Sequence, residues 1–157
     1  MSDAGGSGGA GEAAPSREVR APGSPDHWRR FGDGYLPGLI GIEFVDVARG
    51  LVTSRLAIRK DHLAPNGYLH AATVIALADS SCGYGTVASF PDGVRGFTTV
   101  ELKANFLGTV LEGAIACEAT LAHGGRTTQV WDARVTDEAT GRAIALFRCT
   151  QLLLYPR

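Results

Sequence analysis

Apolar and polar positions alternate along residues 42–58, and Arg49-Gly50 interrupts the alternation near its middle. A period of two is typical of a β-strand with one buried face, and a break that contains glycine supplies a tight turn. We therefore expect a β-hairpin in this part of the chain.

The same period returns after Pro91-Asp92-Gly93, in four segments separated by short breaks. The breaks at Gly124-Gly125 and Thr140-Gly141 have the composition of hairpin turns. Strands joined in this way predict an antiparallel meander in the C-terminal half. The four segments cover residues 96–106, 113–122, 126–136 and 142–154.

Between the hairpin and these segments, an apolar run from about Leu69 to Ala88 is too long for an ordinary strand. Val74, Leu77 and Ser81 recur at helical spacing, and the other faces of the run are apolar as well, which predicts a helix buried on most sides. A curled sheet can bury such a helix. We therefore expect an α+β fold in which an antiparallel sheet wraps around one long central helix.

The N-terminal part of the chain has a different composition. Residues 1–23 are rich in Gly, Ala and Ser and nearly lack large hydrophobic side chains, so we expect a disordered tail. Ser24-Pro25-Asp26 then offers an N-cap, a proline at the first helical position and an acid in the first turn, which predicts a short helix through Trp28 and Phe31. Residues 24–157 are expected to form a single domain.

Composition excludes several classes of function. The net charge of −1, with charged residues at 20%, provides no basic field for nucleic acid or anionic lipid. No stretch reaches the roughly 18 to 20 apolar residues of a membrane-spanning helix, and no signal peptide is evident. The three cysteines and four histidines are dispersed, which predicts buried thiols and no metal site. We expect a cytoplasmic protein without nucleic-acid or membrane partners.

The central apolar run contains one carboxylate, Asp79, although an isolated charge in an apolar setting costs several kcal/mol or more. Gly67 can adopt the positive φ of a turn before the helix, and residues from Ala71 to Thr73 would then present free backbone N–H groups at the helix N-terminus. Such an end can bind an oxyanion or a polarised carbonyl oxygen. Together, the two features suggest acyl transfer or hydrolysis with Asp79 as base or nucleophile.

Helix geometry separates these two features. Eight residues at about 1.5 Å rise place Ala71 and Asp79 roughly 12 Å apart along the axis, too far to act on one carbonyl. The two halves of a site would then come from two chains. A two-fold dimer with antiparallel helices would bring Asp79 of each chain near the Ala71 end of its partner, with two equal sites per dimer.

The order of elements and the segment Gly67-Tyr68-Leu69-His70-Ala71-Ala72, followed by Asp79 nine residues after His70, resemble the hotdog-fold acyl-CoA thioesterases. The most similar group is the phenylacetate-pathway and 4-hydroxybenzoyl-CoA type, whose motif is G-x-x-H-G-G with an acid nine residues after the His. The resemblance covers residues from about 36 to 155. It implies hydrolysis of acyl-CoA thioesters by a homodimer, or a dimer of dimers, without any cofactor, because coenzyme A is part of the substrate.

The resemblance also implies roles for individual residues. Asp79 corresponds to the catalytic acid of the family, and Ala71 corresponds to the Gly whose backbone N–H binds the thioester oxygen. Thr99 resembles the Ser or Thr that positions water in some members. The remaining residues expected to bind substrate are His70, Gly67, Ala72, Gly83 and Arg126, the last through a coenzyme A phosphate.

The chain departs from the family motif at two places. The Gly-Gly that follows the His is Ala71-Ala72, which keeps the N–H but narrows the space around the thioester. The Asn or Gln usually found six residues before the His is Ala64. Asn66 is the candidate for the missing amide, although Pro-Asn-Gly is also an ordinary turn sequence.

Other interpretations of these residues remain open. Asp79 could be a structural carboxylate satisfied by Ser80 or Ser81, His70 could be a helix-start residue that donates to the backbone, and Cys82 could serve packing alone. For the whole chain, the alternatives to a thioesterase are a non-catalytic acyl-CoA-binding module and a hotdog hydratase or dehydratase. The last would resemble a signature with a His paired to an acid, which the sequence lacks.

Overall fold

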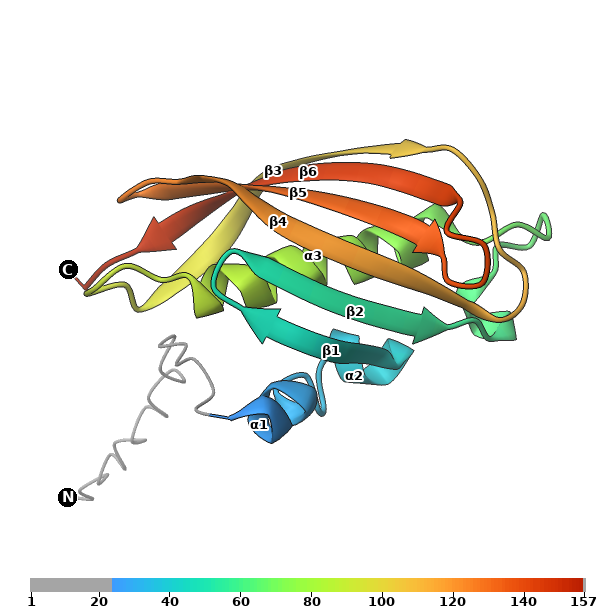
Figure 1. Cartoon of the computed structure of the whole chain (residues 1–157), viewed down its shortest axis with the longest axis horizontal. Helices are drawn as coiled ribbons and strands as arrows, with labels where there is room; N and C mark the ends of the chain where they lie inside the picture. Colours follow the sequence, from blue (N-terminus) through green and yellow to red (C-terminus); the bar gives the residue numbers. More distant parts are fainter. Residues whose placement is uncertain (1–23, 157) are drawn as a thin grey trace, which may run out of the picture.

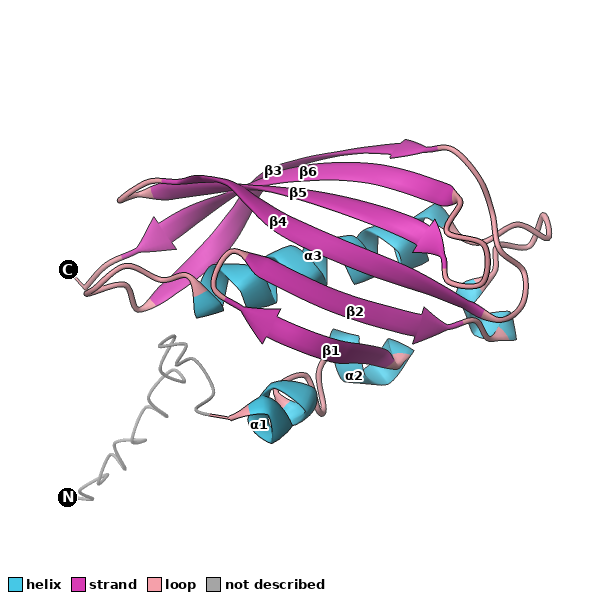
Figure 2. Cartoon of the chain, in the orientation of Figure 1, coloured by secondary structure: helices cyan, strands magenta, loops and turns pink. Residues whose placement is uncertain are grey.

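The computed structural model describes residues 24–156, in which one antiparallel sheet of six strands curls around a long helix. Figure 1 shows the helix α3 lying on the concave side of the sheet, and Figure 2 separates helices from strands in the same view. The strands are β1 (Ile42–Ala48), β2 (Leu51–Ala57), β3 (Gly96–Phe106), β4 (Ala114–Gly124), β5 (Thr128–Asp137) and β6 (Ala143–Leu154). The predicted fold class and the first hairpin are confirmed.

The spatial order of the strands is β1-β2-β4-β5-β6-β3, which corrects the predicted meander. The segments β4, β5 and β6 do form a meander, but β3 pairs with β6, and β4 pairs with β2. Chain order misled the prediction because α3 carries the chain under the sheet to its far edge. The connection at 107–113 then returns the chain to the middle of the sheet, so β3 becomes an edge strand.

The helix α3 (Ala71–Ala88) agrees with the predicted central helix. Val74, Leu77 and Ala78 are buried in its first half, and every residue from Ser81 to Val87 is buried in its second half. Burial on all faces explains why the run is apolar around the whole helix. The first half of the helix is more exposed to solvent, and Asp79 lies close to the point where the buried second half begins.

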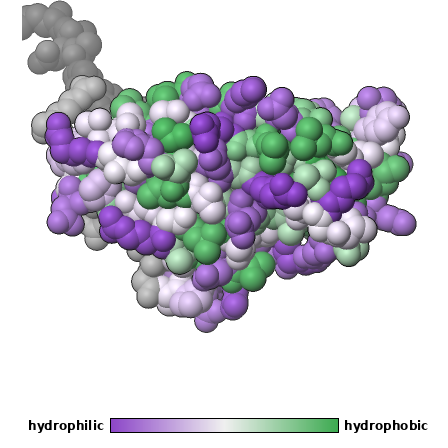
Figure 3. All heavy atoms as spheres, turned by 45° about the horizontal axis from the view of Figure 1, so that its top comes forward, coloured by the Kyte–Doolittle hydropathy of each residue, from purple (hydrophilic) through white to green (hydrophobic). Residues whose placement is uncertain are grey.

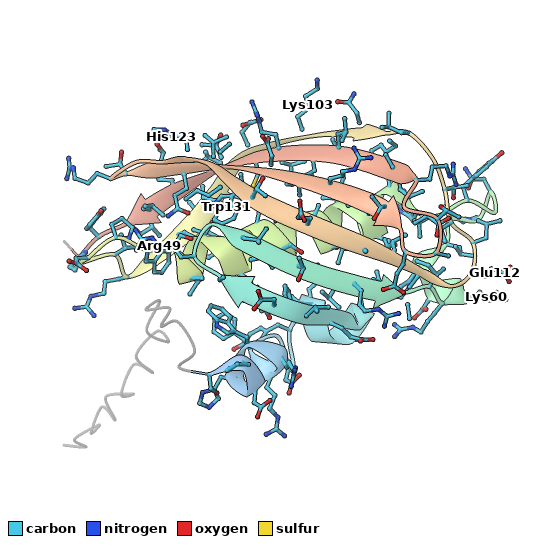
Figure 4. The ribbon with its side chains drawn as sticks, in the orientation of Figure 1. Arg49, Lys60, Lys103, Glu112, His123 and Trp131 are labelled. Atoms are coloured by element: carbon cyan, nitrogen blue, oxygen red, sulfur yellow. The ribbon has the colours of Figure 1, made fainter. Side chains whose placement is uncertain are left out.

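Two glycines of α3 allow sheet side chains to approach its backbone. A methyl group at Gly85 would lie 2.4 Å from the Trp131 ring, and one at Gly83 would lie 3.2 Å from the Phe97 ring. Trp131 is fully buried, and Figure 4 shows it pointing from β5 toward α3, whereas Lys103 points away from the helix. Each glycine lowers the intrinsic stability of the helix by about 1 kcal/mol relative to alanine, and the close aromatic packing that it allows offsets this cost.

The N-terminal segments cover one side of this core. The helix α1 (Pro25–Arg30) begins at Ser24, whose side chain accepts from the His27 N–H, as the sequence predicts. Trp28 packs against Tyr84 of α3 at a ring distance of 5.7 Å. The sequence did not predict the short helix α2 (Leu36–Ile40) or the 3₁₀ helix η1 (Lys60–His62). The predicted tail at residues 1–23 lies outside the described residues.

No helix within residues 24–156 combines the length and the apolarity needed to cross a membrane. All three cysteines are buried and free, as predicted. Figure 3 turns the outer side of the sheet forward and shows hydrophobic and hydrophilic groups interspersed on it. The ion pair between Arg148 and Asp132 lies there.

Candidate functional site

Asp79 and Thr99 meet where α3 passes beneath the edge strand β3. The Thr99 hydroxyl lies 3.4 Å from one carboxylate oxygen of Asp79. Asp79 is only partly buried in the single chain, so its side chain is not fully removed from solvent. The structure therefore brings together the predicted acid and the predicted water-positioning hydroxyl, although twenty residues separate them in sequence.

Burial raises the pKa of Asp79 above its usual value, and a hydrogen bond donated by the Thr99 hydroxyl would lower it without cancelling this shift. Removal of a carboxylate from water disfavours its charged form, which makes the ionised group a better proton acceptor. No charged side chain of the described residues contributes to this pKa. A carboxylate of this kind, partly exposed and without a counter-ion, has the properties of a general base.

Ser81, one of the two hydroxyl residues that could satisfy a purely structural Asp79, does not bond to it. The Ser81 hydroxyl donates to the Leu77 carbonyl at 2.7 Å and lies 2.7 Å from the Ser54 hydroxyl, on the buried side of the helix. The Ser81 hydroxyl therefore has its partners on the buried side of the helix and not at Asp79. Cys82 is fully buried, and both its contact with Cys149 and its burial raise the pKa of its thiol, as expected for a packing residue and not for a nucleophile.

The start of α3 contains one free backbone donor among the groups that the structure describes. His70 is the N-cap, and its Nδ1 accepts from the Ala72 N–H at 2.9 Å. The Thr73 N–H donates to the His70 carbonyl at 3.0 Å. Within residues 24–156, no acceptor is found for the Ala71 N–H. Ala71 thus presents the donor that the oxyanion hypothesis requires, whereas the N–H of Ala72 is already bonded.

This geometry corrects the expectation that His70 donates to the backbone. The first N–H groups of a helix have no intrahelical acceptor, so a side chain that caps this end must itself accept. With Nδ1 accepting, the ring proton of a neutral His70 lies on Nε2. His70 is exposed and stands beside the free Ala71 N–H.

The turn before the helix is built as its sequence suggests. Gly67 has a φ of +85°, which a residue with a side chain would rarely adopt. The Asn66 side-chain oxygen accepts from the Tyr68 N–H at 3.2 Å, so half of the amide closes the turn. Ala64 also bonds within this turn, to Tyr68 and to Gly67. The Asn66 amide nitrogen remains available on an exposed side chain.

The other two predicted substrate residues lie away from this helix start. Gly83 is buried under Phe97, one turn beyond Asp79, and its lack of a side chain serves packing in the single chain. Arg126 is exposed in the turn between β4 and β5. Figure 1 shows this turn at the same end of the molecule as the C-terminus of α3, opposite the Ala71 end.

The edge strand β3 carries apolar side chains that the single chain leaves uncovered. Val100, Leu102 and Phe106 are 55%, 40% and 47% exposed, and Leu107 and Leu111 in the following loop are also exposed. Leu102 and Phe106 lie opposite the buried Cys149 and Ala145 of β6, so they belong to the inner side of the sheet. A long apolar edge strand of this kind is a ready template for pairing with another chain.

Sequence reasoning missed Gln151, a fully buried polar residue behind Thr99. Its side-chain oxygen accepts from the Thr99 hydroxyl at 2.9 Å. A signal was present, because Gln151 occupies an inward position in the period-two pattern of residues 142–154. A polar side chain at such a position needs a buried partner.

Comparisons with known proteins identify the family of this chain. Residues 66–144 match the family model of the thioesterase superfamily, a span that includes the helix start, Asp79 and Thr99. A 1,4-dihydroxy-2-naphthoyl-CoA hydrolase of Listeria monocytogenes is 34% identical over 112 residues, which cover 71% of this chain and 89% of the relative.

Solved structures share the fold. A thioesterase of Pseudomonas aeruginosa, solved as a mutant, superposes with a TM-score of 0.79 at 23% identity and covers 90% of this chain and 100% of that one. The PaaI protein of Escherichia coli, from its phenylacetic acid degradation operon, gives a TM-score of 0.68 at 19% identity, with 75% of this chain and 83% of that chain covered. Both support the hotdog topology of the sheet and helix.

Proposed function

Because the chain belongs to the thioesterase superfamily and is a thioester hydrolase, we propose that it hydrolyses acyl-CoA thioesters at a site that combines Asp79 with the Ala71 N–H. One observation carries this proposal. The single helix α3 presents an unbonded N–H at its positive end and, two turns later, a carboxylate whose pKa is raised by burial. These are the two groups that attack on a thioester requires.

In the proposed reaction, the Ala71 N–H and the positive end of the helix dipole hold the carbonyl oxygen as it becomes negative. A water molecule held by Thr99 adds its oxygen to the carbonyl carbon and passes a proton to Asp79. The carbon–sulfur bond then breaks, and the proton moves to the coenzyme A sulfur, which releases free acid and thiol. Alternatively, Asp79 attacks directly and water cleaves the resulting anhydride. Single turnover in oxygen-18 water distinguishes the routes, because direct attack leaves label in Asp79.

We propose that each site is shared between two chains. Ala71 and Asp79 lie eight residues apart on one helix, roughly 12 Å along its axis, which is too far for one thioester carbonyl. The free apolar edge of β3, next to Asp79, offers the surface on which a second copy would dock. A two-fold pairing of these edges sets the two helices antiparallel.

A mixed-dimer experiment tests the shared site. Proline fits the first helical position, and the His70 ψ of 133° suits a residue before proline, so Ala71→Pro should remove the donor without breaking the helix. Ala71→Pro and Asp79→Asn should each be nearly inactive alone. After random exchange, half of the dimers carry one intact site of two, which restores about a quarter of wild-type activity. No recovery in exchanged dimers would mean that both groups act within one chain.

We propose further that two dimers associate through the outer side of the sheet, where Leu146, Leu152 and Leu154 are exposed. Sedimentation equilibrium measures this assembly directly. Leu152→Lys should reduce a tetramer to dimers and leave thiol release unchanged, because the outer side lies away from Asp79. A wild-type protein that sediments as a dimer would refute this part.

The acyl group is approached through a panel of substrates. The Listeria relative is named for an aromatic acyl-CoA, so we propose an aryl-CoA preference here and test it against short and medium acyl chains. Release of free thiol from each acyl-CoA gives the activity and the specificity together. Saturable binding without thiol release would indicate a non-catalytic binding module, and release from none would refute the proposed substrate class.

Asn66 is proposed to supply the amide that Ala64 lacks, through the amide nitrogen that the turn leaves free. Asn66→Ala should then lower kcat/KM by about tenfold or more. Asn66→Asp is the companion variant: it keeps the oxygen that closes the turn but replaces the nitrogen donor with a second carboxylate oxygen and a negative charge, so it should lower kcat/KM at least as much as Asn66→Ala. An effect under about twofold in both variants would leave Asn66 as a turn residue and the Ala71 N–H as the sole donor.

A further inference from the structure

Gln151 connects the candidate site to the interior of the sheet. It lies directly across from Thr99 in the register of β6 and β3, and its side chain is fully buried. Its Oε1 accepts from the Thr99 hydroxyl at 2.9 Å, and its Nε2 donates to the Cys149 sulfur at 3.3 Å. The amide is therefore held on both sides, and its oxygen is directed at Thr99.

The Thr99 hydroxyl has one proton and two neighbouring acceptors. The oxygen of Gln151 lies at 2.9 Å, within the usual range for O–H···O bonds, whereas the Asp79 oxygen at 3.4 Å lies beyond it. The proton therefore belongs to the bond with Gln151. What Thr99 turns toward Asp79 is a lone pair, which can accept a hydrogen from water but cannot neutralise the carboxylate.

We propose that Gln151 is a positioning residue that keeps the Thr99 proton away from Asp79, so that the carboxylate has no hydrogen-bond donor among residues 24–156 of its own chain and retains its full strength as base or nucleophile. A donor to a carboxylate stabilises its charged form and lowers its pKa and its basicity. Without the Gln151 oxygen, the Thr99 hydroxyl would rotate and donate to Asp79. The role of Gln151 in the reaction rests on the proposed function, but its effect on Asp79 does not.

Few other groups can influence Asp79. Thr99 faces it from β3, and the neutral thiol of Cys82 lies near it on the same helix, backed by Cys149 of β6. Burial by the helix and sheet is what raises the pKa of Asp79, and no cation or second carboxylate of the described residues takes part. A change in the Asp79 pKa after substitution of Gln151 is therefore attributable to the Thr99 proton.

The test is a titration of the Asp79 carboxyl carbon by NMR, with the signal identified by its absence in Asp79→Asn. Gln151→Met should lower the pKa of Asp79 by roughly one pH unit, because the freed Thr99 proton now stabilises the carboxylate. Thr99→Val alone should shift the pKa by less than about a third of a unit, because it removes no donor to Asp79. Thr99→Val added to Gln151→Met should restore the wild-type value.

Gln129→Met is the matched control. Gln129 is the direct cross-strand partner of Gln151, it is equally buried, and its hydrogen bonds lead to Ser89 and Trp131. The same substitution there should leave the Asp79 titration unchanged, which separates an effect of the Thr99 proton from a general effect of core disruption.

Two results would overturn the proposal. One is an unchanged Asp79 pKa in Gln151→Met. The other is a rise of about one unit in Thr99→Val, which would show that Thr99 is the donor to Asp79, and which decides the matter even if Gln151→Met does not fold. The kinetic readout is separate: the acidic limb of kcat/KM against pH should move with the titration. If wild-type protein releases no thiol while the titrations behave as expected, the proposed function fails and the Gln151 network stands.

Discussion

Gln129 and Gln151 lie opposite each other on β5 and β6, both buried beneath the same sheet, yet their hydrogen bonds end differently. Gln129 donates to the Ser89 carbonyl at 3.0 Å and accepts from the Trp131 indole at 2.9 Å, so its network closes on partners that are fixed in the core. The network of Gln151 runs through Thr99 toward the partly exposed Asp79.

The comparison shows that residue type and burial do not decide the role of a buried amide. The network of Gln129 gives both polar atoms of its amide a partner in the core, next to the second half of α3, where the helix is enclosed. The network of Gln151 is open, in the sense that it leads through Thr99 to Asp79, a partly exposed carboxylate that could still accept a proton. On the proposed function, the same helix has a structural half that ends next to Ser89 and a half that takes part in the chemistry through Asp79.

The largest expected effect comes from removing the end of the open network. Asp79→Asn should lower kcat by at least about 10²-fold, because it deletes the base or nucleophile while it keeps the shape of the side chain. Thiol release, measured on protein shown to be dimeric, provides the readout. Near-wild-type turnover in Asp79→Asn would show that Asp79 is structural and that the two glutamine networks do not differ in function.

The same variant has a second readout in stability. Burial raises the native pKa of Asp79 above its unfolded value, so the native state binds more protons between these two pKa values. The ionised carboxylate therefore lowers the free energy of unfolding at neutral pH. Asp79→Asn should be more stable than wild type at pH 7, and the difference should shrink as the pH falls toward about 4. Urea denaturation at several pH values measures it, and a destabilised Asn variant at pH 7 would contradict the assignment.

Breaking the closed network should affect stability and leave chemistry unchanged. Gln129→Met leaves the Trp131 N–H and the Ser89 carbonyl without partners in the core, which should cost about 3 kcal/mol of unfolding free energy. Activity per folded molecule should stay within about twofold of wild type, since no atom of Gln129 leads toward Asp79. Denaturation and thiol release on the same sample separate the two quantities. A large loss of turnover at full folding would make both glutamines functional.

A smaller effect is expected from the glycines that seat the aromatic side chains. Gly85→Ala places a methyl 2.4 Å from the fully buried Trp131 ring and should destabilise by about 2 kcal/mol after the gain in helix propensity. Gly83→Ala meets Phe97 at 3.2 Å, and because Phe97 is only partly buried it can shift, so the loss should be smaller. Thermal unfolding of the two variants shows which substitution destabilises more. A larger loss in Gly83→Ala than in Gly85→Ala would mean that the helix is packed more tightly at Gly83, the glycine nearer to Asp79.

The smallest effect concerns a buried hydroxyl that belongs to neither network. The Tyr84 hydroxyl has no partner within the described residues, and burial, helped by the charge of Asp33, raises its pKa to about 12. Tyr84→Phe keeps the ring stacked on Phe44 and removes the unpaired group, so it should leave stability unchanged or raise it by up to about 1 kcal/mol. A loss above about 1 kcal/mol in chemical denaturation would show that this hydroxyl is satisfied in solution.

Much of the fold follows from local pattern. The hairpin at residues 42–58, the helix at 71–88 and the strand at 96–106 are where the alternation, the helical spacing and the breakers predict them. Backbone geometry imposes these periods on any strand or helix with a buried face, so they can be recognised without knowledge of neighbours. The motif around His70 and the spacing to Asp79 are local in the same sense.

Tertiary structure alone decided which elements lie side by side. A period of two tells which face of β3 is buried but not which strand it pairs with, and for this reason the predicted meander was wrong at β3. The same limit applies to the site. Thr99, Gln151 and Asp79 lie on three elements that meet only when the chain crosses under the sheet. The proposed position of the Thr99 hydroxyl proton rests on two distances, 2.9 Å and 3.4 Å. Hydrogen bonding depends on separations of tenths of an ångström, which packing sets and local sequence patterns do not encode.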